Sequence, residues 1–453
     1  MSDTGLLLTA AGGVAALLLL IIKGRVQPFV ALVVVSVAVA LAAGVPADEL
    51  VSTVEEGMGS TLGHIATIIA LGAMIGRLIE LSGGAHAFAR SLIDRFGARR
   101  TPLALTSAGF ILGIPVFVEV GMIILMPIAY GVARTSRRPL LVYALPMCAA
   151  LLTVHAFLPP HPGAVAVAET IGADQGLVLL MGLPITAIVV AVGYLISRRI
   201  TRREYPMDPA LRASVYDAEE TATDGTDGER PPSFGMVLTL VVTPIALILL
   251  GTLAENFLAE GSYPRAVLTV LGAPLVALLV DVALCGYFLG IRRGWDRARV
   301  GEVMASAVPG VAMVILIAGA GGMFGKVLVA SGIGDAVADL LDKTGLPALA
   351  LGFLMTMALR AAQGSTTVAL ITTAGILTPL LERGDLSTAQ LSLVALAMGA
   401  GGLAVSHIND AGYWMFTRLT GLDVSAGLRT WTVLTTLMGA TGFALTAAVW
   451  PLL

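Results

Sequence analysis

Four short polar or proline-rich segments interrupt long apolar runs of this chain, and they hold most of the side chains that can bind a solute or a proton. They are GIPVFVEVG at 113–121, FLPPHPGA at 157–164, AQGSTTVA at 362–369 and SHINDAGYW at 406–414. At membrane depth, backbone groups can leave a helix only where protein or a watery cavity satisfies them. The four segments therefore predict the place where a transporter would hold its cargo.

Proton chemistry is predicted in the first two segments. Glu119 lies in an apolar stretch where a charged carboxylate is costly, so we expect it to bind a proton or a substrate hydroxyl. The alternative is that Glu119 only pins its segment, for instance through Arg360. His155 and His161 flank the unwound prolines 159–162, and histidine titrates near neutral pH. We interpret His161 as a proton-coupling candidate and His155 as a buried structural imidazole.

The third segment offers neutral donors and acceptors beside helix ends that attract anions. Alternatively, its hydroxyls bond back to their own helix. Arg360 either receives a substrate carboxylate through its forked donors or serves as a structural partner. The predicted substrate-binding residues here are Gln363, Gly364, Ser365, Thr366 and Thr367.

The fourth segment places four polar side chains, Ser406, His407, Asn409 and Asp410, within five positions. Such density inside an apolar run is hard to explain by packing. Asn409 suits hydroxyl recognition, and Asp410 either binds a proton or caps a helix. We predict that both line the binding site.

Composition fixes the class of protein. The chain has 453 residues, of which 57% are hydrophobic and 13% charged, and this is too little polar surface for a soluble globule of that size. It predicts an all-α polytopic membrane protein. The net charge of −3 argues against nucleic acid. The sequence holds none of the common catalytic motifs, and neither a metal-ligand pattern nor a cofactor is indicated, so we do not expect an enzyme. Cys148 and Cys285 are expected to be packing residues.

Apolar runs of about 20 residues predict the membrane spans. Five basic clusters follow alternate spans and are expected to face the cytoplasm, which puts both termini and an acidic loop at 48–56 outside. The predicted spans are 6–22, 29–45, 65–81, 140–170, 177–196, 236–257, 266–289, 303–329, 391–422 and 430–450.

Two other segments are predicted to enter the membrane and turn back. Segment 101–134 is basic at both ends, so both ends face the cytoplasm and 113–121 lies at the tip of a re-entrant hairpin. Segment 347–381 is expected to do the same from outside. Helices that follow Ser82 and Ser331 are expected to lie along opposite membrane surfaces.

The two halves of the chain resemble each other, because residues 75–97 match residues 324–345. The first copy lies inside and the second outside, so we predict an inverted repeat, which is typical of alternating-access carriers. Three landmarks share one offset of 249: Ser82 with Ser331, Pro115 with Gly364, and His161 with Asp410 (410 − 161 = 249).

The predicted organisation has three parts. A hydrophilic cytoplasmic linker at 198–233 is expected to join the repeats without carrying the function. Isolated charges such as Asp281 are expected to form helix-end or interhelical pairs. The N-terminal repeat, 1–197, contains the hairpin 101–134 and an interrupted helix 139–170; the C-terminal repeat, 234–453, contains the hairpin 347–381 and an interrupted helix 391–422.

Together the four segments resemble the landmarks of the gluconate permease (GntP) family, in that family's order, and GADQG at 172–176 adds to the resemblance. It implies a bacterial inner-membrane symporter for gluconate or a related organic acid and protons, with paired hairpins, two broken helices, a dimerisation scaffold and elevator-like movement. It also implies that Glu119, His161, the Ser365–Thr367 tip, Asn409 and Asp410 line one substrate cavity.

The leading hypothesis is an organic-anion:proton symporter in the lipid bilayer, with gluconate as substrate and Glu119, His161 or Asp410 carrying the proton. A sodium-coupled carboxylate or D-serine transporter is the alternative within transport, because unwound carbonyls also hold Na⁺. A membrane sensor or channel subunit acting through the linker is the alternative from another class.

Overall fold

The computed structural model is built of helices. It describes residues 2–216, 231–333, 336, 347–408 and 410–453, and within these ranges no β-strand occurs. The predicted all-helical class is thereby confirmed. Asn409 and most of the helix expected after Ser331 lie outside the described residues.

Helix bounds follow the apolar runs and their breakers. The α-helices are α1 (Asp3–Ile22), α2 (Pro28–Ala43), α3 (Ala47–Leu81), α4 (Gly84–Phe96), α5 (Thr101–Leu112), α6 (Val118–Ser136), α7 (Leu141–Phe157), α8 (Pro162–Thr170), α9 (Gln175–Ile200), α10 (Pro209–Tyr216), α11 (Phe234–Phe257), α12 (Tyr263–Gly272), α13 (Pro274–Cys285), α14 (Arg297–Ala305), α15 (Val308–Ala330), α17 (Ala348–Gln363), α18 (Thr366–Arg383), α19 (Thr388–Leu403), α20 (Ala411–Thr420), α21 (Val424–Gly427) and α22 (Val433–Val449). Short 3₁₀ or π turns are η1 (Ala98–Arg100), η2 (Gly286–Gly290), η3 (Ile291–Arg293), η4 (Leu428–Thr432) and η5 (Trp450–Leu452).

The helices are long and apolar enough for a multi-pass membrane protein. Within the described ranges, nine helical stretches have the length and hydropathy to cross a bilayer. One of them, Leu141–Thr170, is α7 and α8 taken together, and it is interrupted by the turn at 158–161. The prolines remove backbone donors there, as the sequence predicts.

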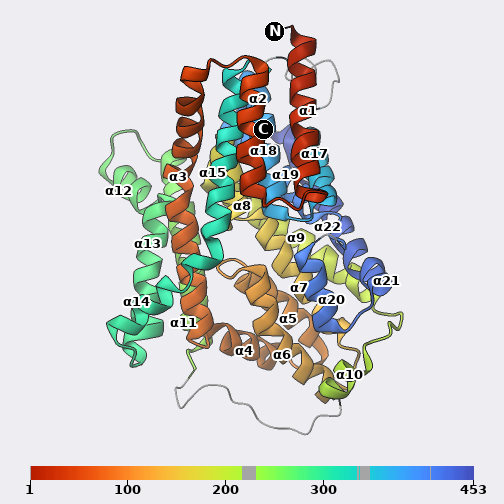
Figure 1. Cartoon of the computed structure of the whole chain (residues 1–453). Coiled ribbons are helices and arrows are strands. Elements are labelled where there is room, and N and C mark those ends of the chain that lie inside the picture. Colours follow the sequence, from red (N-terminus) through yellow and green to blue (C-terminus); the bar gives the residue numbers. More distant parts are fainter. Residues whose placement is uncertain (1, 217–230, 334–335, 337–346, 409) are drawn as a thin grey trace.

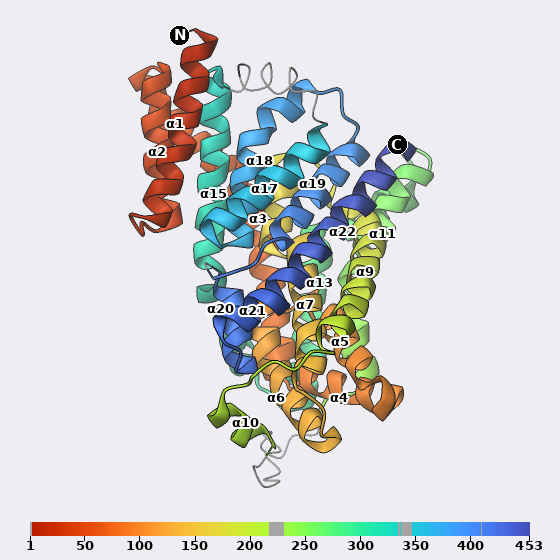
Figure 2. The ribbon, with the colours of Figure 1, turned by 90° about the vertical axis from the view of Figure 1, so that its right-hand side faces the viewer.

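Two pairs of helices joined by short turns lie toward opposite ends of the molecule. Helices α5 and α6 lie in the lower part of both views, whereas α17 and α18 lie in the upper part (Figures 1 and 2). Both chain ends lie in the upper part, and α10, which precedes the linker, lies at the bottom. The interrupted helices α7/α8 and α19/α20 lie between these extremes.

The offset of 249 found in the sequence also relates helix bounds. Helix α3 ends at Leu81 and α15 at Ala330 (81 + 249 = 330). Helix α9 begins at Gln175 and α21 at Val424 (175 + 249 = 424). The residue that precedes α8 is His161 and the residue that precedes α20 is Asp410, again 249 apart. The same order of elements therefore occurs twice, and the inverted relation between the two copies stays a prediction.

Small residues allow the central helices to cross closely, as is common in membrane bundles. A Cβ atom on Gly399 of α19 would lie 2.8 Å from the carbonyl oxygen of Ala156 on α7. One on Gly401 would lie 2.3 Å from the carbonyl oxygen of Phe353 on α17. Neither position has room for a side chain, so α19 packs directly on the backbones of α7 and α17.

Two sequence expectations are wrong in detail, and the structure refines a third, the linker, whose role stays a prediction. The acidic loop expected at 48–56 is helical, because α3 begins at Ala47 and its first-turn acids Asp48 and Glu49 favour a helix N-terminus. The single span expected at 266–289 is divided between α12 and α13 at Pro274. The linker expected at 198–233 contains the end of α9 and all of α10, and its residues 217–230 lie outside the described ranges.

Candidate functional site

The turn between α19 and α20 is organised by a buried ion pair. Arg360 on α17 pairs with the carboxylate of Asp410, and the two side chains are only 1% and 9% exposed. Arg360 also donates to the carbonyl oxygen of Gly364, in the turn between α17 and α18. One guanidinium thus ties the tip of the α17/α18 pair to the break in α19/α20.

Asp410 has further partners, so its carboxylate is well satisfied. It accepts a hydrogen bond from the Ser406 hydroxyl, and its Oδ1 accepts from the Gly412 N–H at 2.9 Å, which caps α20. Ser406 in turn accepts from Trp431 Nε1 at 2.7 Å, and its carbonyl oxygen accepts from Thr432 Oγ1 at 2.6 Å. The break is thereby held by groups from α17, α20 and η4.

The break between α7 and α8 is organised by two histidines. Nδ1 of His155 and Nδ1 of His161 are 3.2 Å apart, so the two rings share one proton between them. Nε2 of His161 bonds the carbonyl oxygen of Gly113, in the turn between α5 and α6. The edge of Phe117 lies against the His161 ring, with 6.0 Å between centroids. His161 therefore ties the first helix pair to the first break, much as Arg360 ties the second pair to the second break.

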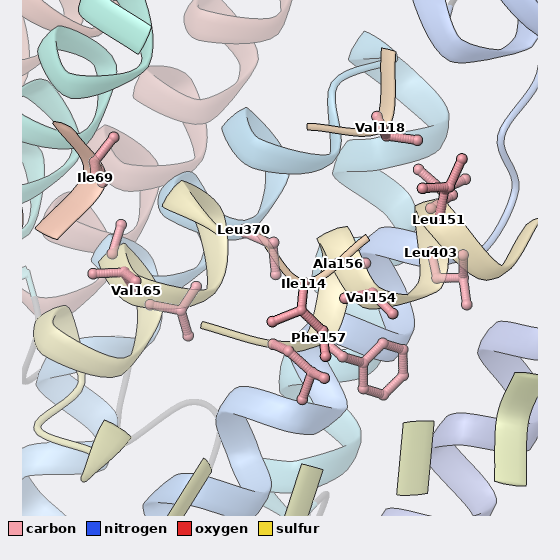
Figure 3. Close-up of a cluster of buried hydrophobic side chains, with 14 of the residues drawn as sticks. Ile69, Ile114, Val118, Leu151, Val154, Ala156, Phe157, Val165, Leu370 and Leu403 are labelled. Carbon is pink, nitrogen blue, oxygen red and sulfur yellow. The ribbon is translucent and has the colours of Figure 1, made fainter. Parts of the chain in front are cut away.

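The first break meets the second helix pair at the N-terminal turns of α8 and α18. A Cβ atom on Gly163 of α8 would lie 3.4 Å from Cα of Thr367 on α18. On the other side of α18, the Thr366 hydroxyl donates to the carbonyl oxygen of Gly402 on α19 at 3.2 Å. Leu370 of α18 also lies against Gly163, and Figure 3 shows Leu370 and Val165 of α8 among buried apolar side chains. Two helix N-termini are thus brought together in a mainly apolar setting.

Three predicted binding residues keep polar side chains without a hydrogen-bond or ion-pair partner among the described residues, and none of the three is fully buried. They are Glu119 in the first turn of α6, Gln363 at the end of α17, and Thr367. The charges of Arg360 and Asp410 act on Glu119, which places its carboxylate near the second break.

The structure brings most of the predicted residues into one region. Ser365 caps α18, since its hydroxyl accepts from the Val368 N–H at 3.3 Å, and Gly364 has a left-handed φ of 88° that favours glycine. Asn409 lies outside the described residues. Among the described residues Arg360 pairs with Asp410, and no hydrogen bond or ion pair joins it to Glu119, the alternative raised from the sequence.

Sequence reasoning missed two sets of residues. Trp431 and Thr432 hold Ser406, although they lie far along the chain from the fourth segment. Gly163 and Gly399 allow close contacts of α8 with α18 and of α19 with α7. The glycine-rich run 399–402 was the available signal for the second set, because clustered small residues mark close helix packing.

Asp281 does not form the interhelical pair expected of it. The side chain is completely buried in α13, and its Oδ1 has no hydrogen-bond partner in the described part of the molecule.

Comparisons with known proteins agree with this architecture. The chain is 46% identical over 453 residues to the inner membrane permease YgbN of Escherichia coli, with 99% of each chain covered. It is 37% identical over 440 residues to a gluconate permease of Bacillus subtilis, covering 96% of this chain and 97% of that one. The solved YdaH transporter of Alcanivorax borkumensis has a similar fold, with a TM-score of 0.61 at 15% identity and 90% of each chain covered. The model of GntP family permeases matches residues 5–453, and the chain therefore belongs to this family of transporters.

Proposed function

We propose that this chain imports gluconate or a related small organic acid together with protons. Its family and its nine candidate spans in the described ranges make it a multi-pass inner-membrane transporter. A relative that is named a gluconate permease, 37% identical over almost the whole chain, supports gluconate as the first substrate to test.

The observation that carries the proposal is the meeting of α8 and α18 at Gly163 and Thr367. The first N–H groups of a helix have no intrahelical partner, and the helix dipole adds partial positive charge there. A carboxylate that binds beside this contact would meet donors from both N-terminal turns. The unpartnered Thr367 hydroxyl and Gln363 amide stand beside this place and can bond substrate hydroxyls.

Other helix ends in this region are already occupied by the protein's own groups. Asp410 accepts from the N–H of Gly412 and so fills the N-terminus of α20. Glu119 lies in the first turn of α6 and places negative charge there. By contrast, α8 has no side-chain cap and α18 is capped only by the neutral Ser365 hydroxyl, so this pair is the favoured anion site.

Glu119 is the favoured carrier of the coupled proton among the three candidates. Asp410 is ion-paired with Arg360 and would lose that pairing on protonation. His161 has both ring nitrogens engaged, by Gly113 and by His155. Glu119 has no side-chain partner among the described residues, so it can gain and lose a proton without dismantling a network.

Movement between outward and inward states follows from the same proposal. The repeated order of helix bounds supports two inverted repeats, and we propose that the breaks and helix pairs move together past a dimeric scaffold, with both termini outside. Protonation and anion binding then stabilise one occluded state, and this couples the two gradients.

The test is uptake of radiolabelled gluconate by proteoliposomes under a single imposed gradient. An inward proton gradient should drive accumulation, whereas a sodium gradient at equal pH should not. Accumulation driven by sodium alone would instead support the sodium-coupled reading. Thermal-shift measurements with gluconate, other sugar acids and D-serine identify the substrate, because a ligand stabilises the fold in proportion to its occupancy.

A further inference from the structure

A buried carboxyl group outside the candidate site borders a small closed space. Asp281 lies in α13, within the candidate span Pro274–Arg293, and is completely buried. Its Oδ2 receives a weak hydrogen bond from the Cys285 thiol at 3.8 Å, and its Oδ1 has no partner among the described residues. An ionised carboxylate in such a place lacks compensation for its lost hydration.

The space beside Asp281 is a cavity of about 20 Å³. One water needs roughly 10–15 Å³ of such volume, so the cavity has room for a single molecule. No other lining residue is titratable or has a side-chain oxygen; they are Gly72 and Ile75 of α3, Ile114, Pro115, Pro159 and Pro160 of the two turns, Leu179 of α9, Val241, Pro244, Ile245 and Ile248 of α11, and Leu278 of α13.

The cavity shares two of its walls with the candidate functional site. Pro160 directly precedes His161, and His161 bonds Gly113, two residues before Pro115. The same two turns therefore face the histidines on one side and Asp281 on the other. A displacement of the turns relative to α13 would open the cavity and change the hydration of Asp281.

We propose that Asp281 is a second proton-binding site of this transporter. It is neutral, and bonded to one water, while the turns at Pro115 and Pro160 pack against α13. When that packing opens, water reaches the carboxyl group and takes up its proton, and the resulting carboxylate is reprotonated from water on closure. The link to transport rests on the proposed function, but the bound proton itself does not.

The first test is infrared spectroscopy of the purified full-length protein, which detects the C=O stretch of a protonated carboxyl group directly. At neutral pH the wild type should show such a band, and Asp281→Asn should lack it. The matched control, Asp385→Asn, removes an exposed carboxylate and should leave the band unchanged. Any protonated-carboxyl band of Glu119 is common to the wild type and Asp281→Asn, so identical spectra of these two proteins in this region would overturn the proposal.

A second variant tests the role of the cavity without altering Asp281. Ile245→Ala enlarges the space and admits more water, so the band should disappear at a lower pH than in the wild type. An unchanged pH titration of the band would overturn the cavity's role. A band removed by sodium chloride but not by choline chloride would also overturn it, because that result would assign a cation site. If Asp281→Asn fails to fold, the pH titration of the infrared band in Ile245→Ala still tests the proposal.

The third measurement concerns coupling. Asp281→Asn should lower proton-driven uptake roughly tenfold, within the usual range of coupling between sites, and leave the thermal shift with gluconate intact. Normal uptake by the variant would refute a role in coupling. If the wild type itself takes up no gluconate, the proposed function fails, while the infrared band still decides whether Asp281 holds a proton.

Discussion

Arg360 is the residue on which the second break depends. Its guanidinium is 1% exposed and bonds both Asp410 and the Gly364 carbonyl oxygen, so it joins two turns that lie 46 positions apart in sequence (410 − 364 = 46). A charge buried so completely is tolerated only when paired. This pairing favours the structural interpretation of Arg360 over direct binding of substrate.

Removing the Arg360 guanidinium should therefore destabilise the folded protein. Arg360→Met leaves the Asp410 carboxylate buried without its cation, and we expect a loss of about 3–5 kcal/mol in the free energy of unfolding. The double variant Arg360→Met/Asp410→Asn should recover part of this loss. Thermal melting in detergent measures both effects.

Arg77 provides the control, since its ion pair with Glu80 is partly exposed, at 33% and 20%. Arg77→Met should cost no more than about 1 kcal/mol. Equal losses for Arg77→Met and Arg360→Met would contradict the special role of the buried pair.

Glu119 makes a separate prediction at the residue scale. Glu119→Gln keeps the size of the side chain but cannot release a proton, so the exchange of external for internal gluconate should continue while accumulation driven by a pH gradient is lost. Counterflow and gradient-driven uptake are measured in the same proteoliposomes. Undiminished accumulation by Glu119→Gln would show that another group carries the coupled proton.

At the scale of elements, the meeting of α8 with α18 is the central contact. A Cβ at Gly163 would lie 2.9 Å from Cδ1 of Leu370 and 3.4 Å from Cα of Thr367, so a branched side chain there would push the two turns apart. The approach of two N-terminal turns is what makes the place suited to an anion.

Gly163→Val should separate the two turns and weaken gluconate binding roughly tenfold or more, through lost donors and displaced substrate. The matched control is Gly131→Val in α6, where an added Cβ meets no atom within 4 Å. Affinity is read by isothermal titration of purified protein. Equal affinity for the Gly163→Val variant and the wild type would place the anion elsewhere.

The sequence predicted the breaks well and the contacts between them poorly. Pro159 and Pro160 remove backbone donors, and Gly364 permits a left-handed turn, so local chemistry alone located the first interruption and the turn between α17 and α18. The start of α3 was misplaced because its acids suit a loop and a first helical turn equally well. The Gly163–Thr367 contact and the unpaired state of Asp281 depend on elements far apart in sequence, which no local pattern specifies.

At the scale of the whole molecule, the repeated order of elements explains how one chain supplies two similar breaks. Elements from α3 to α9 recur from α14 to α22 at an offset of 249, and α2 falls within the stretch Pro274–Arg293 that contains α13 (28 + 249 = 277; 43 + 249 = 292). The matched elements contain the helix pairs and breaks.

The linker offers a test between transport and signalling. Replacing residues 217–230 with a Gly/Ser segment of equal length should leave gluconate uptake unchanged, since the proposed site lies wholly within the matched elements. The comparison uses equal amounts of protein in the membrane. Loss of uptake in a folded variant would favour a sensor or channel subunit that acts through this segment.

The face-to-face arrangement of α8 and α18 has a consequence for the carrier when it holds no cargo. The N-terminal turns of the two helices, each with partial positive charge, then lie in contact at Gly163 and Thr367 without an anion beside them. A bound organic anion neutralises both partial charges at once and draws the N-termini of α8 and α18 together. The substrate-bound transporter should thus close readily, and the empty transporter should close less readily. The geometry that binds the substrate therefore also limits movement of the empty binding site across the membrane.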